Sequence, residues 1–354
     1  MGLKGLIARR IILAVPTALG VATVIFAVLS VMSPIMRVAY FVGSTRDLRP
    51  ENLNALIHAY GLDQPIHVQY FNWLKNVMRL DFGRSFSSEA PAMSLVFASL
   101  PVTLELLLYS VPLIIVFGVS LGTKAALHHN KTLDHAVRVI GTLGTSLPVF
   151  VTAGLAILIC LIVQNPRQVR LDPYLQVSYS VDYDLNLRMA AGTFTEYTQM
   201  ITIDALLNGD IPLFLDAMAH LILPVGVLVF TQCAALIRVT RSSLIEESGK
   251  WYIVSAMSKG LSKKEAMYKH ARRNASVSVL TLTGLLLANM FVGLVIVETV
   301  FRRPGFAYLV ASASRVQDTP VVFACATLIA LFYVLVNLAI DVSYEYIDPR
   351  IRLG

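Results

Sequence analysis

Six long stretches of this chain contain no Asp, Glu, Lys or Arg, and each has at least 18 residues. A helix rises about 1.5 Å per residue, so about 20 apolar residues cross a hydrocarbon core of roughly 30 Å. The stretches lack the alternating pattern of barrel strands, which leaves the helix as the spanning structure. We therefore predict six transmembrane helices, within Ile11–Met36, Leu106–Thr123, Val139–Pro166, Ala217–Ile237, Asn274–Val297 and Thr319–Ile340.

The composition supports an all-α membrane protein. Hydrophobic residues make up 56% of the chain and charged residues 14%, whereas a soluble domain has about 25% charged residues. The net charge of +7 could indicate nucleic-acid binding, but its uneven distribution along the chain indicates membrane orientation instead. We expect no nucleic-acid partner.

Basic residues are concentrated in particular connecting segments. Residues 238–273 carry nine Lys and Arg against three acids, whereas residues 164–216 carry three Arg against seven acids. The positive-inside rule therefore places both termini and the basic loops in the cytoplasm. The first apolar run follows Arg9-Arg10 as in a signal peptide, but it is long and lacks a cleavage site, so we favour a retained helix. The predicted order is a cytoplasmic N-terminus with the first helix (1–33), an extracytoplasmic segment (34–100), the second helix (101–123), a cytoplasmic loop (124–142), the third helix (143–163), an extracytoplasmic segment (164–216), the fourth helix (217–239), a cytoplasmic loop (240–274), the fifth helix (275–300), an extracytoplasmic loop (301–319), the sixth helix (320–342) and a cytoplasmic tail (343–354).

The extracytoplasmic segments have short helical patterns of their own. We predict amphipathic helices over Glu51–Tyr60 and Val68–Leu80, and another near Ile201–Leu207. These helices could cap the membrane bundle, form a platform for an external partner, or do both.

Motifs for catalysis are absent from the sequence. It contains no G-x-x-x-x-G-K-[ST], so the chain should not hydrolyse ATP itself, and no H-E-x-x-H, C-x-x-C or G-x-S-x-G. We predict no catalytic residue, no metal site and no cofactor in this chain. Glu105 is interpreted as the only acid near the apolar interior of a span, whereas an ion-coupled carrier usually has charges near the midplane. An external energy source is therefore expected.

The loop 240–274 has the pattern helix, glycine turn, helix. The first helix is predicted from about Ser243 to Ser258, and Gly260 ends it because glycine tolerates the left-handed conformation. Ser262 and Glu265 have the spacing of a capping box for a following basic helix. Such an exposed helix could dock into a groove on another protein or lie on anionic lipid. The physical pattern leaves both readings open.

Residues 252–261, Y-I-V-S-A-M-S-K-G-L, resemble the cytoplasmic loop of inner-membrane permeases of binding-protein-dependent ABC importers. In that family a short E-A-A-x-x-x-G element forms a coupling helix that docks on the ATPase subunit. This chain is closer to the Y-I-x-T-A-x-x-K-G form of the dipeptide/oligopeptide branch. The resemblance implies partner contacts by Tyr252, Val254, Ser255, Ala256, Met257, Lys259, Gly260 and Leu261.

Short matches to the same branch follow one another along nearly the whole chain. They make this chain resemble the first of the two permeases that such systems pair. The matching segments include G-L-D-Q-P at 61–65, D-F-G-R-S at 81–85, S-L-P-V-F at 146–150, H-L-I-L-P at 220–224, E-T-V-F at 298–301 and D-P-R-I-R at 348–352.

The resemblance implies a type I ABC importer permease fold and a set of partners. These partners are a second homologous permease subunit, two cytoplasmic ATPase subunits that bind ATP and Mg, and an extracytoplasmic solute-binding protein, all assembled in membrane lipid. Alternating access would be driven by the ATPases. Peptides are the default solute, with oligosaccharides as an alternative, and some relatives are associated with nickel. The rival functions are an ion-coupled secondary transporter and a membrane receptor or scaffold without transport.

Three amides interrupt the later apolar runs, namely Gln232, Asn289 and Asn337. An amide in lipid lacks hydrogen-bond partners, so each should face protein or water. We interpret them as candidate pore-lining residues, with hydrogen bonding between helices as the alternative.

Overall fold

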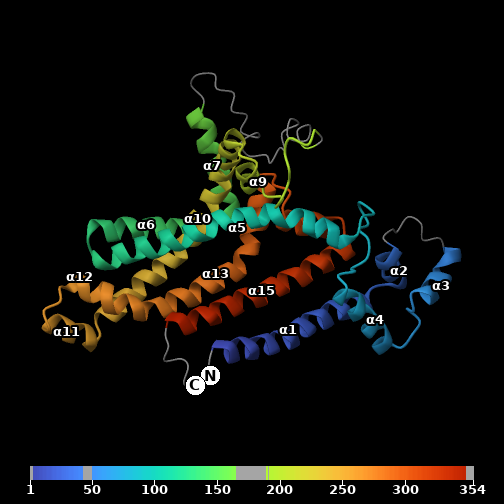
Figure 1. Ribbon diagram of the computed structural model, residues 1–354, viewed down its shortest axis with the longest axis horizontal. Coiled ribbons are helices and arrows are strands. Elements are labelled where there is room, and N and C mark those ends of the chain that lie inside the picture. The colour runs from blue at the N-terminus through green and yellow to red at the C-terminus, as the bar shows by residue number, and fades with distance from the viewer. Residues whose placement is uncertain (1–2, 43–49, 165–188, 190, 348–354) are drawn as a thin grey trace. The chain divides into compact units, whose positions relative to one another are not determined.

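The computed structural model describes residues 3–42, 50–164, 189 and 191–347. The predicted all-α fold class is confirmed: helices dominate the described part, whose β-structure is limited to an isolated bridge between Arg84 and Pro91. The helices are α1 (Leu3–Val31), α2 (Pro34–Val42), α3 (Pro50–Ala59), α4 (Ile66–Met78), α5 (Ala92–Leu127), α6 (Thr132–Ser146), α7 (Val149–Gln164), α9 (Ile201–Leu207), α10 (Ile211–Ser248), α11 (Trp251–Ser258), α12 (Lys263–Ala266), the π-helix η1 (Met267–Ala271), α13 (Arg272–Val300), α14 (Phe306–Arg315) and α15 (Thr319–Ile347) (Figure 1).

Several helices are long and apolar enough to cross a membrane. Four qualify on their own: Ala92–Leu127, Ile211–Ser248, Lys263–Phe291 and Thr319–Ile340. A fifth qualifies if the bent pair α6–α7 is counted as one span, and the described apolar part of α1, Val15–Val31, is shorter. The six-span count thus stays a prediction, while the short helices predicted near residues 51–60, 68–80 and 201–207 are confirmed as α3, α4 and α9.

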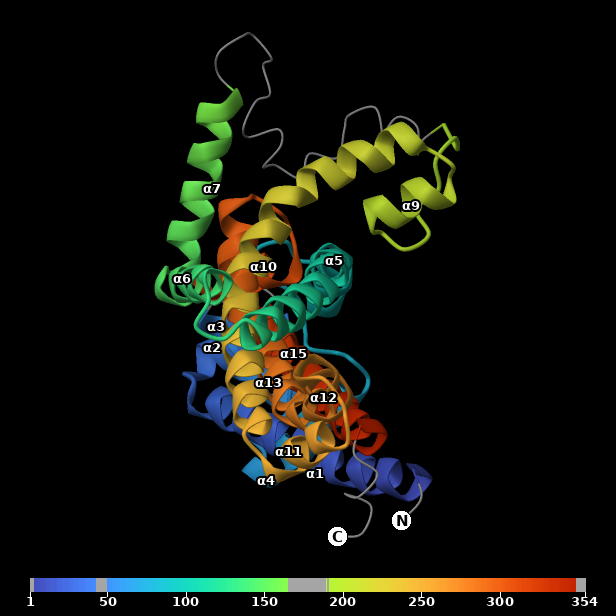
Figure 2. The ribbon, with the colours of Figure 1, turned by 90° about the vertical axis from the view of Figure 1, so that its left-hand side faces the viewer.

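A sharp bend falls inside the predicted third helix, 143–163. The axes of α6 and α7 differ by 111°, and Figure 2 shows α7 rising steeply from the end of α6. Pro148 lacks an N–H group and disfavours the helical region for the residue before it. Leu147 accordingly has an extended conformation, with ψ of 124°. The predicted loop 124–142 is therefore largely helical, since it contains the end of α5 and most of α6.

The chain divides into two compact units, whose boundaries fall within α1, α5 and α15 and between α13 and α14. The first unit contains residues 102–304 and both chain ends, and α10 is central to it, in contact with α6, α7, α9 and α13. Two glycines allow α5 to approach α10 closely. A Cβ atom on Gly118 would lie 2.6 Å from the Leu236 side chain, and one on Gly122 would lie 2.6 Å from Thr240. Small residues four apart are a common way to pack membrane helices.

An ion pair fixes α6 to α10 in the same unit. The Arg241 guanidinium donates to both oxygens of Asp134, at 2.5 and 2.9 Å. The Asp134 side chain is fully buried, and a charge there requires such a partner. Arg238, one turn earlier, donates to the Thr145 hydroxyl at 2.6 Å.

The second unit contains residues 5–101 and 305–338 and holds the short helices α2, α3, α4 and α14. Aromatic rings join α1 to α4: the ring of Phe26 lies 5.2 Å from Tyr70 and 5.7 Å from Trp73. The buried Asp318 carboxylate accepts hydrogen bonds from the hydroxyls of Ser85 and Ser87, both at 2.6 Å. These contacts order the segment that precedes α5.

Candidate docking helix and buried polar cluster

The loop predicted to dock a partner forms a separate short helix, α11. The continuous helix expected from Ser243 to Ser258 is instead interrupted, because α10 ends at Ser248 and α11 begins at Trp251. Gly260 ends α11, as predicted. Its φ is +97°, a backbone conformation that residues other than glycine rarely adopt. The next amide, Leu261 N, donates to the Ala256 carbonyl at 3.3 Å, which satisfies a carbonyl at the helix end.

The predicted capping box is also confirmed. The Ser262 hydroxyl accepts from Glu265 N at 3.3 Å, and the Glu265 carboxylate accepts from Ser262 N at 2.9 Å. The chain then passes through α12 and the π-helix η1 into α13. Local sequence therefore fixes both the end of α11 and the start of the next helix.

The helix α11 has one face packed against its own chain. Ile253 and Ala256 are only 1% and 8% exposed. They belong to a small core, which we call the loop core, built from the ends of α5 and α10 together with α11, α12, η1 and the start of α13. Its buried members are Ala126, Leu244, Ile253, Ala256, Ala266, Met267, Ala271 and Ala275.

The opposite face of α11 is exposed and carries large apolar side chains. Trp251 is 87% exposed, Val254 48% and Met257 42%. We call these three residues the α11 patch. Of the predicted partner contacts, Val254, Ser255, Met257, Lys259 and Gly260 are exposed, whereas Tyr252 and Leu261 are partly buried.

The structure places two residues of this helix differently from the sequence-based prediction. Ala256 was expected to face a partner, but its side chain packs in the loop core. Trp251 was not among the predicted contacts, although its three-residue spacing from Val254 places both on one helical face. That spacing is the sequence signal that could have placed Trp251 on the exposed face.

Tyr252 ties α11 to the end of α10. Its hydroxyl donates to the Glu247 carboxylate, which also accepts from Lys250. Burial and the hydrogen bond to Glu247 raise the pKa of Tyr252 to about 12. The start of α11 is thereby held by a side-chain contact as well as by the loop core.

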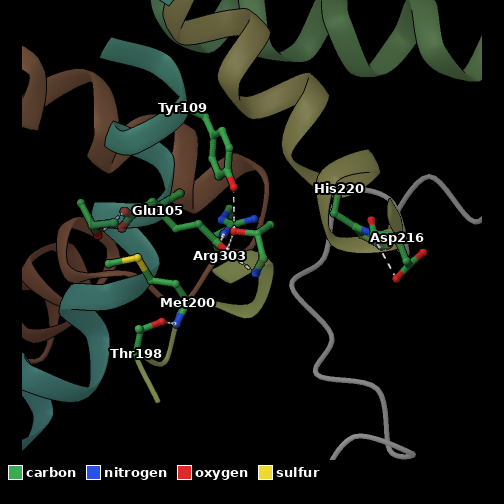
Figure 3. Close-up of polar contacts among 10 residues, drawn as sticks. Glu105, Tyr109, Thr198, Met200, Asp216, His220 and Arg303 are labelled. Atoms are coloured by element: carbon green, nitrogen blue, oxygen red, sulfur yellow. Dashed lines mark hydrogen bonds and ion pairs between the residues drawn. The ribbon is translucent and has the colours of Figure 1, made fainter. Parts of the chain in front are cut away.

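The compact unit that contains α11 also contains a buried polar cluster around Glu105 (Figure 3). One carboxylate oxygen accepts from the backbone N–H and the hydroxyl of Thr202, at 2.9 and 2.8 Å. The other accepts from Arg303 at 2.7 Å, and Tyr109 donates to Thr202 at 3.0 Å. The cluster joins α5, α9 and the segment after α13.

Another buried acid lies in the same unit, at the end of the helix that contains the predicted fifth span. Glu298 is fully buried near the end of α13 and accepts a hydrogen bond from Thr103. Sequence reasoning did not pair Glu105 with Arg303, because no local pattern connects residues that lie 198 positions apart.

The three candidate pore amides lie in different settings. Gln232 is partly buried, and its Nε2 would lie 3.5 Å from a Cβ atom on Gly293, so it is at the contact of α10 with α13. Asn289 is exposed and donates to the Leu285 carbonyl of its own helix at 2.9 Å. Asn337 is exposed on α15 and belongs to the other compact unit.

Comparison with known proteins covers almost the whole chain. The family described as "Binding-protein-dependent transport system inner membrane component" matches residues 114–353, and its N-terminal counterpart matches residues 3–117. The di/tripeptide transport system permease protein DppB of Pseudomonas aeruginosa is 33% identical over 349 residues, with 98% of each chain covered. The dipeptide transport system permease protein DppB of Escherichia coli is 32% identical over 348 residues, again with 98% of each covered. The probable D,D-dipeptide transport system permease protein DdpB of Escherichia coli is 33% identical over 297 residues, covering 83% of this chain and 82% of the relative.

The all-α fold, its apolar spans and these matches define a multi-pass inner-membrane permease subunit with the type I ABC importer fold. The chain belongs to the family of inner-membrane components of binding-protein-dependent transport systems.

Proposed function

We propose that this chain forms, with a second homologous permease, the membrane pathway of an ATP-driven importer of short peptides. The supporting observation is its likeness, over nearly its full length, to permeases named for dipeptides and tripeptides. Two partner ATPase subunits would bind ATP and Mg, because this chain has no P-loop. A solute-binding protein would deliver the peptide on the extracytoplasmic side.

The helix α11 is proposed as the element that receives work from the ATPases. Its exposed α11 patch suits a hydrophobic groove on a partner. Its buried face rests on the ends of α5 and α10 and the start of α13. A push on the patch would reach these longer helices through packed side chains, which transmit displacement because protein interiors are dense. A helix that only lay on lipid would not need this support.

Uptake into proteoliposomes tests the function directly. The full complex should accumulate labelled alanyl-alanine only with ATP, and ionophores that dissipate proton and sodium gradients should leave the rate unchanged. Uptake that persists without ATP and stops with the ionophore would instead identify a secondary transporter. A complex that binds its partners but moves no solute under either condition would support a receptor.

The proposed orientation places both termini and α11 in the cytoplasm. Single cysteines in a chain without native cysteines test it at two exposed positions, Ser88 before α5 and Ser258 at the end of α11. A membrane-impermeant maleimide should label Ser88→Cys in intact cells and Ser258→Cys only after permeabilisation. The opposite pattern contradicts the proposed topology.

The amides Gln232, Asn289 and Asn337 remain proposed pathway residues. Because Gln232 lies at a contact between helices, its change to Leu should affect stability as well as uptake. Asn289 and Asn337 are exposed, so their changes to Leu should affect uptake or peptide preference without affecting stability. If all three Leu variants keep wild-type uptake and selectivity, the pathway role is wrong.

A further inference from the structure

A cavity of about 300 Å³ lies among the short helices of the unit that contains residues 5–101 and 305–338. Its walls come from the end of α1, from α2, from the end of α3 and the turn after it, from α4, and from the segment that follows α4. The helices that carry the candidate pathway amides, α10, α13 and α15, contribute no residue to its lining. The volume is at the lower end of the range for small-molecule sites, about 300–1,000 Å³.

One wall of the cavity carries a cation, Arg37, that has no acidic partner among the described residues. The Arg37 guanidinium donates to the Gln69 side chain, while its buried Nε has no hydrogen-bond partner. No ion pair with Arg37 is found among the described residues. A buried donor without a partner is costly, and an anionic ligand would supply both the missing charge and the missing acceptor.

The cavity also carries an anion, Asp81, for which the described part of the chain supplies no basic partner. Asp81 lines it and accepts from Gly83 N at 3.0 Å through one oxygen; none of the ion pairs in the described part of the chain involves Asp81. Burial, and secondarily the negative charge of Asp81, raise the pKa of Tyr40, whose hydroxyl accepts from Trp73 at 3.3 Å. Asp81 therefore acts electrostatically on a residue inside the same cavity.

Aromatic rings form part of the remaining wall, beside the amides of Gln69, Asn72 and Asn76. Phe41 stacks on Tyr60 at a centroid distance of 5.2 Å, and Tyr40 meets Phe41 edge-on at 5.1 Å. The two charges, which have no ion-pair partner among the described residues, and the aromatic part of the wall are complementary to a small molecule with a carboxylate, an ammonium group and an apolar body. We propose that the cavity binds a short zwitterionic peptide, with its carboxylate at Arg37 and its ammonium group at Asp81.

This site goes beyond the proposed function, because none of the three proposed pathway amides lines it and binding there requires no transport. A direct binding experiment therefore tests it independently of uptake. The full-length chain in nanodiscs of zwitterionic lipid contains only two tryptophans, so Trp251→Phe leaves Trp73, which lines the cavity, as the sole reporter. Alanyl-alanine, its C-terminal amide and its N-acetyl derivative are titrated by fluorescence and by calorimetry.

The free dipeptide should bind at least about tenfold more tightly than either blocked form, because each block removes a charge-assisted hydrogen bond. Arg37→Gln should remove the preference over the amide but keep the preference over the N-acetyl form. Asp81→Asn should do the reverse. Arg79→Gln, which changes an exposed arginine outside the cavity lining, should behave as the parent.

Three results would overturn the proposal. Equal affinity for all three probes would show that the ligand is not recognised as a zwitterion. No binding signal in either fluorescence or calorimetry would show that the cavity is not a binding site. Binding of glycerol phosphate with no binding of the dipeptide would assign the cavity to a lipid headgroup. The Arg37 and Asp81 variants should each lose a different preference, and each preference is measured between probes on the same variant. A general loss of folding would weaken all probes alike and could not produce this pattern.

Discussion

Removal of Arg303 should strongly destabilise the chain, because it leaves the Glu105 carboxylate buried with its charge uncompensated. The two side chains are only 3% and 2% exposed. Breaking such a pair by deleting one partner typically costs about 3–5 kcal/mol. The two hydrogen bonds from Thr202 remain in the Arg303→Gln variant and offset part of this cost. We expect a loss of about 3 kcal/mol in the free energy of unfolding.

A second substitution separates the cost of the uncompensated Glu105 charge from the other effects of replacing Arg303. In the double variant Glu105→Gln, Arg303→Gln no charge remains in the pair, so the loss should be smaller than in Arg303→Gln alone. Arg302→Gln is the matched control, because it removes the same charge from the exposed neighbouring position. Its stability should lie within about 0.5 kcal/mol of wild type.

Unfolding can be followed through the native thiols. Cys233 and Cys325 are 7% and 0% exposed, so a thiol-reactive dye reports loss of tertiary structure in detergent titrations. The reasoning is refuted if Arg303→Gln unfolds as wild type does, or if the double variant is less stable than Arg303→Gln.

The remaining predictions concern the contact of α5 with α10 and the α11 helix. Gly122→Val should destabilise the chain by several kcal/mol in the same titration, because a Cβ atom there would lie 2.8 Å from the Ile237 carbonyl oxygen, which cannot easily move; wild-type stability would contradict this close approach. Val254→Asp, on the exposed face, should lower co-purification of the ATPase subunits at least tenfold and leave unfolding of the isolated chain unchanged. Ala256→Asp should destabilise the isolated chain itself by several kcal/mol, since the new charge enters the loop core; if instead it affects only co-purification, Ala256 faces the partner. Gly260→Val should cost about 1–3 kcal/mol, because a β-branched residue resists φ of +97°, and unchanged ATP-dependent uptake would show that this turn is not needed for coupling.

The features that the sequence determined by itself are local or periodic. Apolar runs identify membrane helices because lipid leaves the backbone no other way to satisfy its hydrogen bonds. Gly260 and the Ser262–Glu265 capping box were predictable because each acts within one turn of helix. The bend at Leu147-Pro148 has a local cause too, although an uncharged run was read as one continuous helix.

The tertiary structure decided what depends on contacts between distant residues. Whether Ala256 faces a partner or its own chain follows from where the ends of α5 and α10 lie, and no spacing within α11 contains that information. The partner of Glu105 is Arg303, 198 positions away, and the cavity near Arg37 needs four helices to enclose it. A single sequence records each of these charges, but only folding determines which of them are paired, because pairing requires atoms to approach within a few ångströms and chain order does not specify that approach.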